Sequence, residues 1–144
     1  ADALSYAKNF NSMLVIDIAT LTGSANAAVG ENASVVMGTA PKNEIETLIE
    51  TSMTVHERLV EFPLWDDYAE QIKSEMADLK NVGGPLAGSI TAGKFLEHFT
   101  QYPWIHIDIA GSSYFAKGGD YRGKGASGIG VRLLYQFIKK HIQS

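Results

Sequence analysis

The sequence predicts an α/β domain built around a parallel or mixed sheet. Two stretches carry this prediction: residues 13–19 (MLVIDIA) and 104–111 (WIHIDIAG) are nearly continuous apolar runs, each with one aspartate. Such runs are typical of strands that are covered on both faces of a sheet. Segments with helical periodicity alternate with them, which is the pattern of α/β proteins. At 144 residues the chain is long enough for one domain with a substantial core.

The N-terminal part of the chain predicts a helix, a strand, a second helix and a second strand. Residues 1–10 favour a helix that lacks a side-chain cap. Residues 24–29 are small enough for a helix to pack closely on a sheet, and Gly30 suits its C-terminal cap. We expect the two strands at 13–19 and 34–37.

The middle of the chain predicts one surface helix followed by less regular segments. A helix beginning near Pro41 would bury Ile45 and Leu48. Residues 61–64 (EFPL) contain a proline and predict an extended connection rather than a central strand. The other expected segments are a helical stretch at 65–74, a short edge strand at 76–80 and a loop at 81–88.

The C-terminal part predicts two amphipathic helices that flank the second buried strand. Ser89 suits the N-cap of the first of these helices. A polar, glycine-rich loop is expected at 112–128, followed by a helix at about 129–141. The inward positions of that last helix are predicted to be Leu133, Leu134, Phe137 and Ile138.

Composition and charge exclude several classes of function. Twelve Lys and Arg residues stand against 16 Asp and Glu residues, and no basic block occurs, so we expect no nucleic-acid partner and no anionic membrane partner. The absence of cysteine excludes disulfides, thiolate metal sites and a cysteine nucleophile. No apolar run approaches the length of a membrane span. These features predict a cytoplasmic protein.

Asp17 and Asp108 are the most conspicuous charges, because a carboxylate in an apolar strand is costly unless it is paired or hydrogen-bonded. One hypothesis makes them metal ligands or acid–base groups. The other, which we favour, makes each a hydrogen-bond acceptor that ties neighbouring loops together. His106, on the same strand as Asp108, is interpreted as a satisfied interior histidine because no second ligand accompanies it at ligand spacing.

Three short motifs resemble known sites but depart from them at a required position. Residues 56–60 (HERLV) begin like a zinc-binding HExxH helix, yet Val60 replaces the second histidine. Residues 118–124 (GGDYRGK) fit the spacing of a phosphate-binding P-loop, but Gly125 replaces its Ser or Thr. The glycines of 125–130 run in the reverse sense to a dinucleotide fingerprint and are interpreted as backbone freedom at a helix start.

The two buried strands are expected to end at one shared cleft. Residues 20–24 follow the first strand, residues 110–113 follow the second, and the glycine-rich loop is expected to complete the cleft. Open α/β sheets bind ligands outside the carboxyl ends of their strands. No GxSxG motif surrounds a serine of these loops, and the residues alone provide no complete catalytic set.

Four segments taken together resemble the leucyl aminopeptidase family, the M17 or cytosol aminopeptidases. These segments are IDIATLTGSA (16–25), NVGGPLAGSITAGKFL (81–96), WIHIDIAG (104–111) and GASGIGVRLL (125–134). The similarity runs in order over nearly the whole chain. It implies a mixed, largely parallel sheet with helices on both faces, two divalent cations (Mn or Zn) and a homohexamer.

The resemblance also implies that residues 1–144 correspond to the C-terminal half of that family's catalytic domain. The metal-binding segments and the separate N-terminal domain of the family precede the part that is similar to Ala1. We therefore expect no catalytic residue, no metal ligand and no bound cation in this chain. Asp17 and Asp108 match positions that are not counted among the metal ligands.

The part that is present resembles the substrate-binding wall of an enzyme that removes N-terminal residues from peptides by metal-assisted hydrolysis. Thr20, Leu21 and Gly23 match the TLTG loop, whose main chain binds the reacting end of the peptide and whose Leu21 amide lies near a carbonate-like anion. Ala110 and Ser113 match positions that line the pocket for the first side chain. We expect the chain to be inactive alone; the alternative is a non-catalytic subunit or a small-ligand-binding module.

Overall fold

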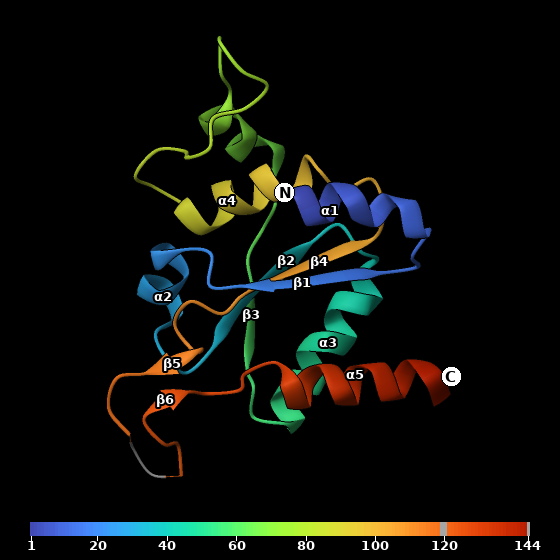
Figure 1. Ribbon diagram of the computed structural model, residues 1–144, viewed down its shortest axis with the longest axis vertical. Helices are drawn as coiled ribbons and strands as arrows, with labels where there is room; N and C mark the ends of the chain where they lie inside the picture. Colours follow the sequence, from blue (N-terminus) through green and yellow to red (C-terminus); the bar gives the residue numbers. More distant parts are fainter. Residues whose placement is uncertain (119–120, 144) are drawn as a thin grey trace.

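The computed structural model describes residues 1–118 and 121–143, and these residues form one four-stranded sheet and a small two-stranded sheet. The strands of the large sheet are β1 (Val15–Ala19), β2 (Ser34–Gly38), β3 (Leu59–Glu61) and β4 (Trp104–Asp108). Their order is β1–β4–β2–β3 (Figure 1). β1 pairs in parallel with β4 and β2 with β3, whereas β2 runs antiparallel to β4. The predicted α/β fold with a mixed, largely parallel sheet is confirmed.

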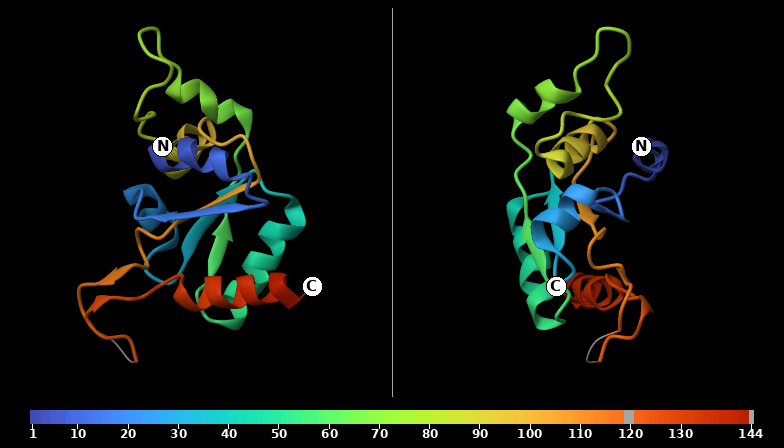
Figure 2. Two further views of the ribbon diagram at one scale, coloured as in Figure 1. Left: turned by 45° about the vertical axis from the view of Figure 1, so that its right-hand side comes forward. Right: turned by 90° about the vertical axis from the view of Figure 1, so that its left-hand side faces the viewer.

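Helices cover both faces of this sheet, as the views in Figure 2 show. One face carries α1 (Asp2–Ala7), α2 (Gly23–Val29) and α4 (Gly88–Glu97), and the other carries α3 (Lys42–Thr54) and α5 (Val131–Gln143). The shorter elements are η1 (Lys8–Phe10), η2 (Asp66–Ile72), β5 (Tyr114–Phe115) and β6 (Gly125–Ala126). None of the described helices is long and apolar enough to cross a lipid bilayer.

The central strand β4 divides the core because successive side chains of a strand point to opposite faces. Ile105 and Ile107 pack toward α3 and α5, while Trp104 packs toward α1 and α4. All three side chains are almost completely buried, which explains why this strand is apolar throughout. Their helical partners are Leu48, Leu133 and Phe137 on the first face, and Leu4 and Leu96 on the second.

The structure differs from two strand predictions. Residues 59–61 form β3, where the sequence predicted no strand; the strand ends before Pro63, so the proline does not interrupt its ladder. The edge strand predicted at 76–80 is wrong, since residues 76–79 form bends and Lys80 has no regular structure. Met76 is 98% exposed, so the alternating pattern there covers no core. The apolar–polar alternation was therefore insufficient evidence for a strand.

Two helix predictions also need correction. Ser89 does not cap α4: Ala87 occupies the N-cap in a left-handed conformation, and the buried Ser89 hydroxyl has no partner among the described residues. Ile138 was predicted to face inward but is 51% exposed. Leu133 and Phe137 already fill the buried side of α5, and Ile138 lies just beyond its edge.

Candidate functional site

The loops that follow β1 and β4 lie side by side at one edge of the sheet. The parallel register places Ala19 opposite Asp108, and the Ile109 amide donates to the Ala19 carbonyl at 2.9 Å. Residues 20–23 and 110–113 therefore leave the sheet at the same point, as predicted for a shared cleft.

Asp108 is the residue that joins these two loops. One carboxylate oxygen accepts hydrogen bonds from the Leu21 amide at 3.1 Å and the Ala110 amide at 3.2 Å. The other accepts from the Thr22 hydroxyl at 2.7 Å. The Asp108 side chain is buried, and these three bonds satisfy both of its oxygens. The hypothesis that Asp108 ties neighbouring loops together is thus confirmed.

The same network fixes the start of α2. The Thr22 hydroxyl that donates to Asp108 also accepts from the Ala25 amide at 3.1 Å, so Thr22 is the N-cap of this short helix. At the other end of α2, Gly30 forms the predicted C-terminal cap with φ of 64°. The loop after β4 passes so close to this cap that a Cβ on Gly111 would lie 2.1 Å from the Gly30 carbonyl oxygen. Glycine is required at this contact.

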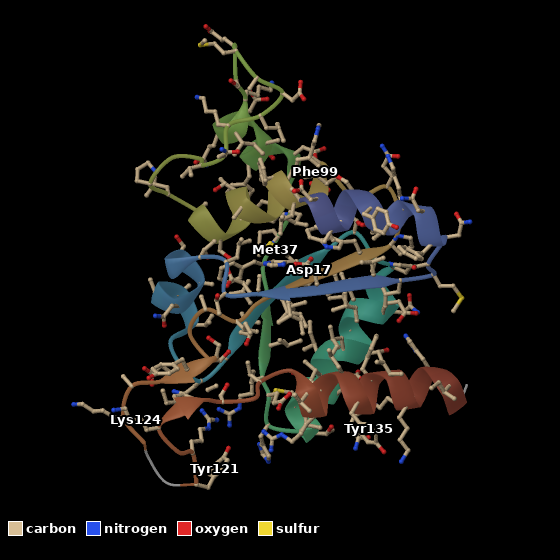
Figure 3. All side chains as sticks on the ribbon, viewed as in Figure 1. Asp17, Met37, Phe99, Tyr121, Lys124 and Tyr135 are labelled. Carbon is tan, nitrogen blue, oxygen red and sulfur yellow. The ribbon has the colours of Figure 1, made fainter. Side chains whose placement is uncertain are left out.

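Asp17 has a different role from the one predicted. It was expected to hold the loop after β1, but its oxygens accept from the Trp104 indole at 2.6 Å and contact His106 Nδ1 at 2.7 Å. Asp17 therefore joins two strands rather than two loops, because it lies opposite His106 in the β1–β4 register. Figure 3 labels Asp17 at the middle of β1.

His106 is an interior histidine, and one of its two ring nitrogens has a hydrogen-bond partner. Its ring is completely buried and stacks with Trp104 at a centroid distance of 6.1 Å. Nδ1 contacts Asp17, while Nε2 has no hydrogen-bond partner among the described residues. The prediction that His106 lies in the interior is confirmed by its complete burial.

Glu57 is a structural residue that the sequence did not reveal. It belongs to the incomplete HExxH motif, yet one of its carboxylate oxygens accepts from the Gly130 and Leu133 amides, both at 3.0 Å. Its other oxygen accepts from Arg132 Nε at 3.0 Å. Glu57 is buried and serves as the cap of α5 from 73 residues away along the chain. Nothing in the local sequence signals so distant a cap.

The remaining motifs that the sequence singled out have structural explanations or extend beyond the described residues. The P-loop-like segment includes Gly119 and Asp120, which lie outside the described residues. The glycines at 125, 128 and 130 all have positive φ angles, which confirms their interpretation as backbone freedom before α5.

The predicted substrate residues lie around the Asp108 network. Thr20, Leu21 and Gly23 are exposed, and Ala110 and Ser113 are half-buried. The structure therefore brings all five to the same corner of the sheet. The predicted anion role of Leu21 stays a prediction, and its amide already donates to Asp108.

Comparison with known proteins supplies the family. The model of the cytosol aminopeptidase family, catalytic domain, matches residues 1–135. The chain belongs to this family. Its relatives include a "Probable cytosol aminopeptidase" of Geobacter sulfurreducens, which is 47% identical over 144 residues. A second from Syntrophotalea carbinolica is 49% identical over 142 residues, and the "Cytosol aminopeptidase" of Pseudomonas aeruginosa PAO1 is 46% identical over 140 residues.

These cytosol aminopeptidases are much longer than the part that matches. The alignments cover 99%, 97% and 95% of this chain, but 29%, 28% and 27% of the three relatives. The chain thus spans somewhat over a quarter of the length of the curated relatives it matches.

The described residues do not fit a metal centre. Nowhere in residues 1–118 and 121–143 do three His, Asp or Glu side chains gather closely enough to hold a metal ion. Asp17 and Asp108, the two aspartates of the buried strands, both accept hydrogen bonds from side-chain or main-chain donors.

Proposed function

We propose that this chain forms the substrate-binding wall of an aminopeptidase that removes N-terminal residues from peptides by metal-assisted hydrolysis. The observation that carries the proposal is the Asp108 network, which holds the loop of Leu21 and the loop of Ala110 in one fixed corner. A wall of this kind must be rigid, because misplacement of a substrate by about 1 Å costs catalysis about a hundredfold.

The chemistry divides between this wall and groups that the chain does not hold. The exposed residues Thr20 and Gly23 would contact the peptide backbone through their main chain, and the half-buried Ala110 and Ser113 would contact its first side chain. Two divalent cations, Mn or Zn, would polarise the scissile carbonyl and lower the pKa of a bound water. We place their ligands in the part of the family's length that this chain does not span.

An activity assay of the chain by itself tests this division. We expect the 144-residue chain to give no turnover of a leucyl chromogenic amide with Mn²⁺ or Zn²⁺, because it lacks a metal-binding cluster among its described residues. The Pseudomonas aeruginosa cytosol aminopeptidase, assayed in parallel, controls for substrate and metal. Turnover by the chain at ordinary enzymatic rates, about 1–1,000 per second, would refute the proposed division.

We further propose that copies of the chain associate with one another, as the homohexamer implied by the family resemblance would require. Four apolar side chains of α5 are 51–81% exposed and follow one another at helical spacing: Val131, Tyr135, Ile138 and Ile142. Such a stripe is typical of a helix face that another surface covers.

The cytosol named in the relatives' descriptions supports a cytoplasmic location for the whole protein.

Light scattering after size-exclusion chromatography tests the association. We expect the wild-type chain to elute above its monomer mass of 15.6 kDa, and the double change Tyr135→Gln with Ile138→Gln to shift it toward the monomer. Lys139→Gln, an exposed change on the same helix, serves as the control and should leave the mass unchanged. A monomeric wild-type chain would argue against self-association through this face.

A further inference from the structure

A pocket lies between the β5–β6 hairpin, the start of α5 and the turn before β3. Its volume is about 470 Å³, within the range of pockets for small molecules. None of the five proposed substrate residues lines it. Figure 3 labels Tyr121 and Lys124 in this region, on the segment that leads into β6.

The pocket carries an excess of positive charge in a chain whose net charge is −4. Its lining includes four cationic side chains from three separate segments: Arg58, Arg122, Lys124 and Arg132. Two carboxylates accompany them, Glu31 and Glu57. Glu57 is buried and already accepts three hydrogen bonds, one of them from Arg132. The acids therefore do not neutralise the site.

Three of the four cations remain available to a ligand. Among the residues that the structure describes, Arg58 and Lys124 make no ion pair and no side-chain hydrogen bond. Arg122 makes no ion pair either; its guanidinium lies over the rings of Phe115 and Tyr121, at 5.2 and 5.6 Å from their centroids. Stacking of this kind orients the planar guanidinium while leaving several N–H donors free.

The pKa of Tyr121 is affected by the positive charge of the pocket. Its hydroxyl accepts a hydrogen bond from Arg122 Nε at 3.3 Å. This bond and the nearby positive charges of Arg122 and Arg132 lower the pKa of Tyr121 below its ordinary value. The surroundings thus favour negative charge at the mouth of the pocket.

We propose that this pocket binds a small phosphorylated ligand, whose phosphate oxygens pair with Arg58, Arg122 and Lys124. Two guanidinium groups suit phosphate because each offers parallel N–H donors, and the ammonium adds a mobile point charge. The rings of Phe115 and Tyr121 offer an apolar surface beside the anion site. The pocket shares Ser112 with the loop of Ala110, but none of the five proposed substrate residues lines it.

Titration calorimetry with inorganic pyrophosphate and with ADP tests the proposal on the 144-residue chain. We expect one site per chain, with Kd below about 1 mM at low salt and weaker binding as the ionic strength rises. Tighter binding of ADP would show that the pocket also holds the nucleoside, and equal binding would show that phosphate alone is recognised; both support the proposal. Failure of both probes to bind would overturn it.

Charge-neutral variants locate the binding in this pocket. Arg58→Gln, Arg122→Gln and Lys124→Gln should each weaken pyrophosphate binding about tenfold, whereas Lys139→Gln on α5 should not change it. Arg122→Lys should weaken binding less than Arg122→Gln, because lysine retains the positive charge but lacks the parallel N–H donors of the guanidinium. Equal loss with Lys139→Gln would overturn the assignment.

A measurement on the wild-type chain stands independently of variant folding. Bound pyrophosphate should raise the pKa of Tyr121, because it adds negative charge beside the phenol. The titration is followed on the assigned NMR signals of the Tyr121 ring, since the chain contains six tyrosines. An unchanged Tyr121 titration at saturating pyrophosphate would contradict binding at this pocket.

Discussion

Replacing Asp108 with alanine is expected to lower the free energy of unfolding by about 2–4 kcal/mol. The change removes the acceptor of the Leu21 amide, the Ala110 amide and the Thr22 hydroxyl. It also leaves a hole where a side chain that is only 1% exposed now packs. Urea denaturation followed by circular dichroism measures the loss.

The asparagine variant separates the hydrogen bonds from the packing. Asp108→Asn retains the shape and one acceptor oxygen, which can still receive the Leu21 and Ala110 amides, so its loss should be smaller than that of Asp108→Ala. Asp78→Ala is the matched control, because Asp78 is exposed and lies in a loop. A loss below 1 kcal/mol for Asp108→Ala, similar to that of Asp78→Ala, would show that Asp108 does not hold the loops together.

The same change should also affect catalysis in an active aminopeptidase that contains this chain. Without Asp108 the loops of Leu21 and Ala110 are no longer held to one anchor, and kcat/KM for a leucyl amide should fall about a hundredfold. The protein must first be shown to remain folded at the assay temperature. An unchanged kcat/KM would separate the Asp108 network from substrate positioning.

The strands of the large sheet could be predicted to different extents from the sequence. β4 is buried along its whole length, whereas β1 lies at the edge of the sheet and is half-buried, yet both strands carry long apolar runs. β3 spans three residues at the sheet edge, of which Leu59 alone is buried, so it has too little apolar pattern to be recognised. At residues 76–80 the pattern was present without a surface to cover, and no strand formed.

The candidate site shows a similar division between local and distant information. The loops after β1 and β4 were predicted to meet, because the carboxyl ends of neighbouring parallel strands lie at the same edge of a sheet. Which aspartate holds the loop was not predictable, since it depends on register: Asp108 lies opposite Ala19 at the strand end, whereas Asp17 lies opposite His106 within the strands. Two similar sequence contexts thus give two different roles.

Replacing Glu57 with alanine is the second change expected to have a large effect. The Gly130 and Leu133 amides are buried and would lose their acceptor, and Arg132 would lose its partner. We expect a loss of about 2–4 kcal/mol, because an N-terminal cap and two buried hydrogen bonds disappear together. The loss should be concentrated in α5, and hydrogen exchange of its amides should accelerate more than that of β4.

Two further variants decide whether Glu57 acts as the cap of α5. Glu57→Gln retains one acceptor oxygen of the same reach and should recover a large part of the stability. Glu50→Ala, an exposed change on α3, should have little effect on unfolding or on exchange. Leu133 and Phe137 anchor α5 in the core. Unfolding of the first turn, which includes Leu133, should therefore also increase hydrogen exchange farther along the helix. Uniform acceleration of exchange across the sheet and helices would instead assign Glu57 a global packing role.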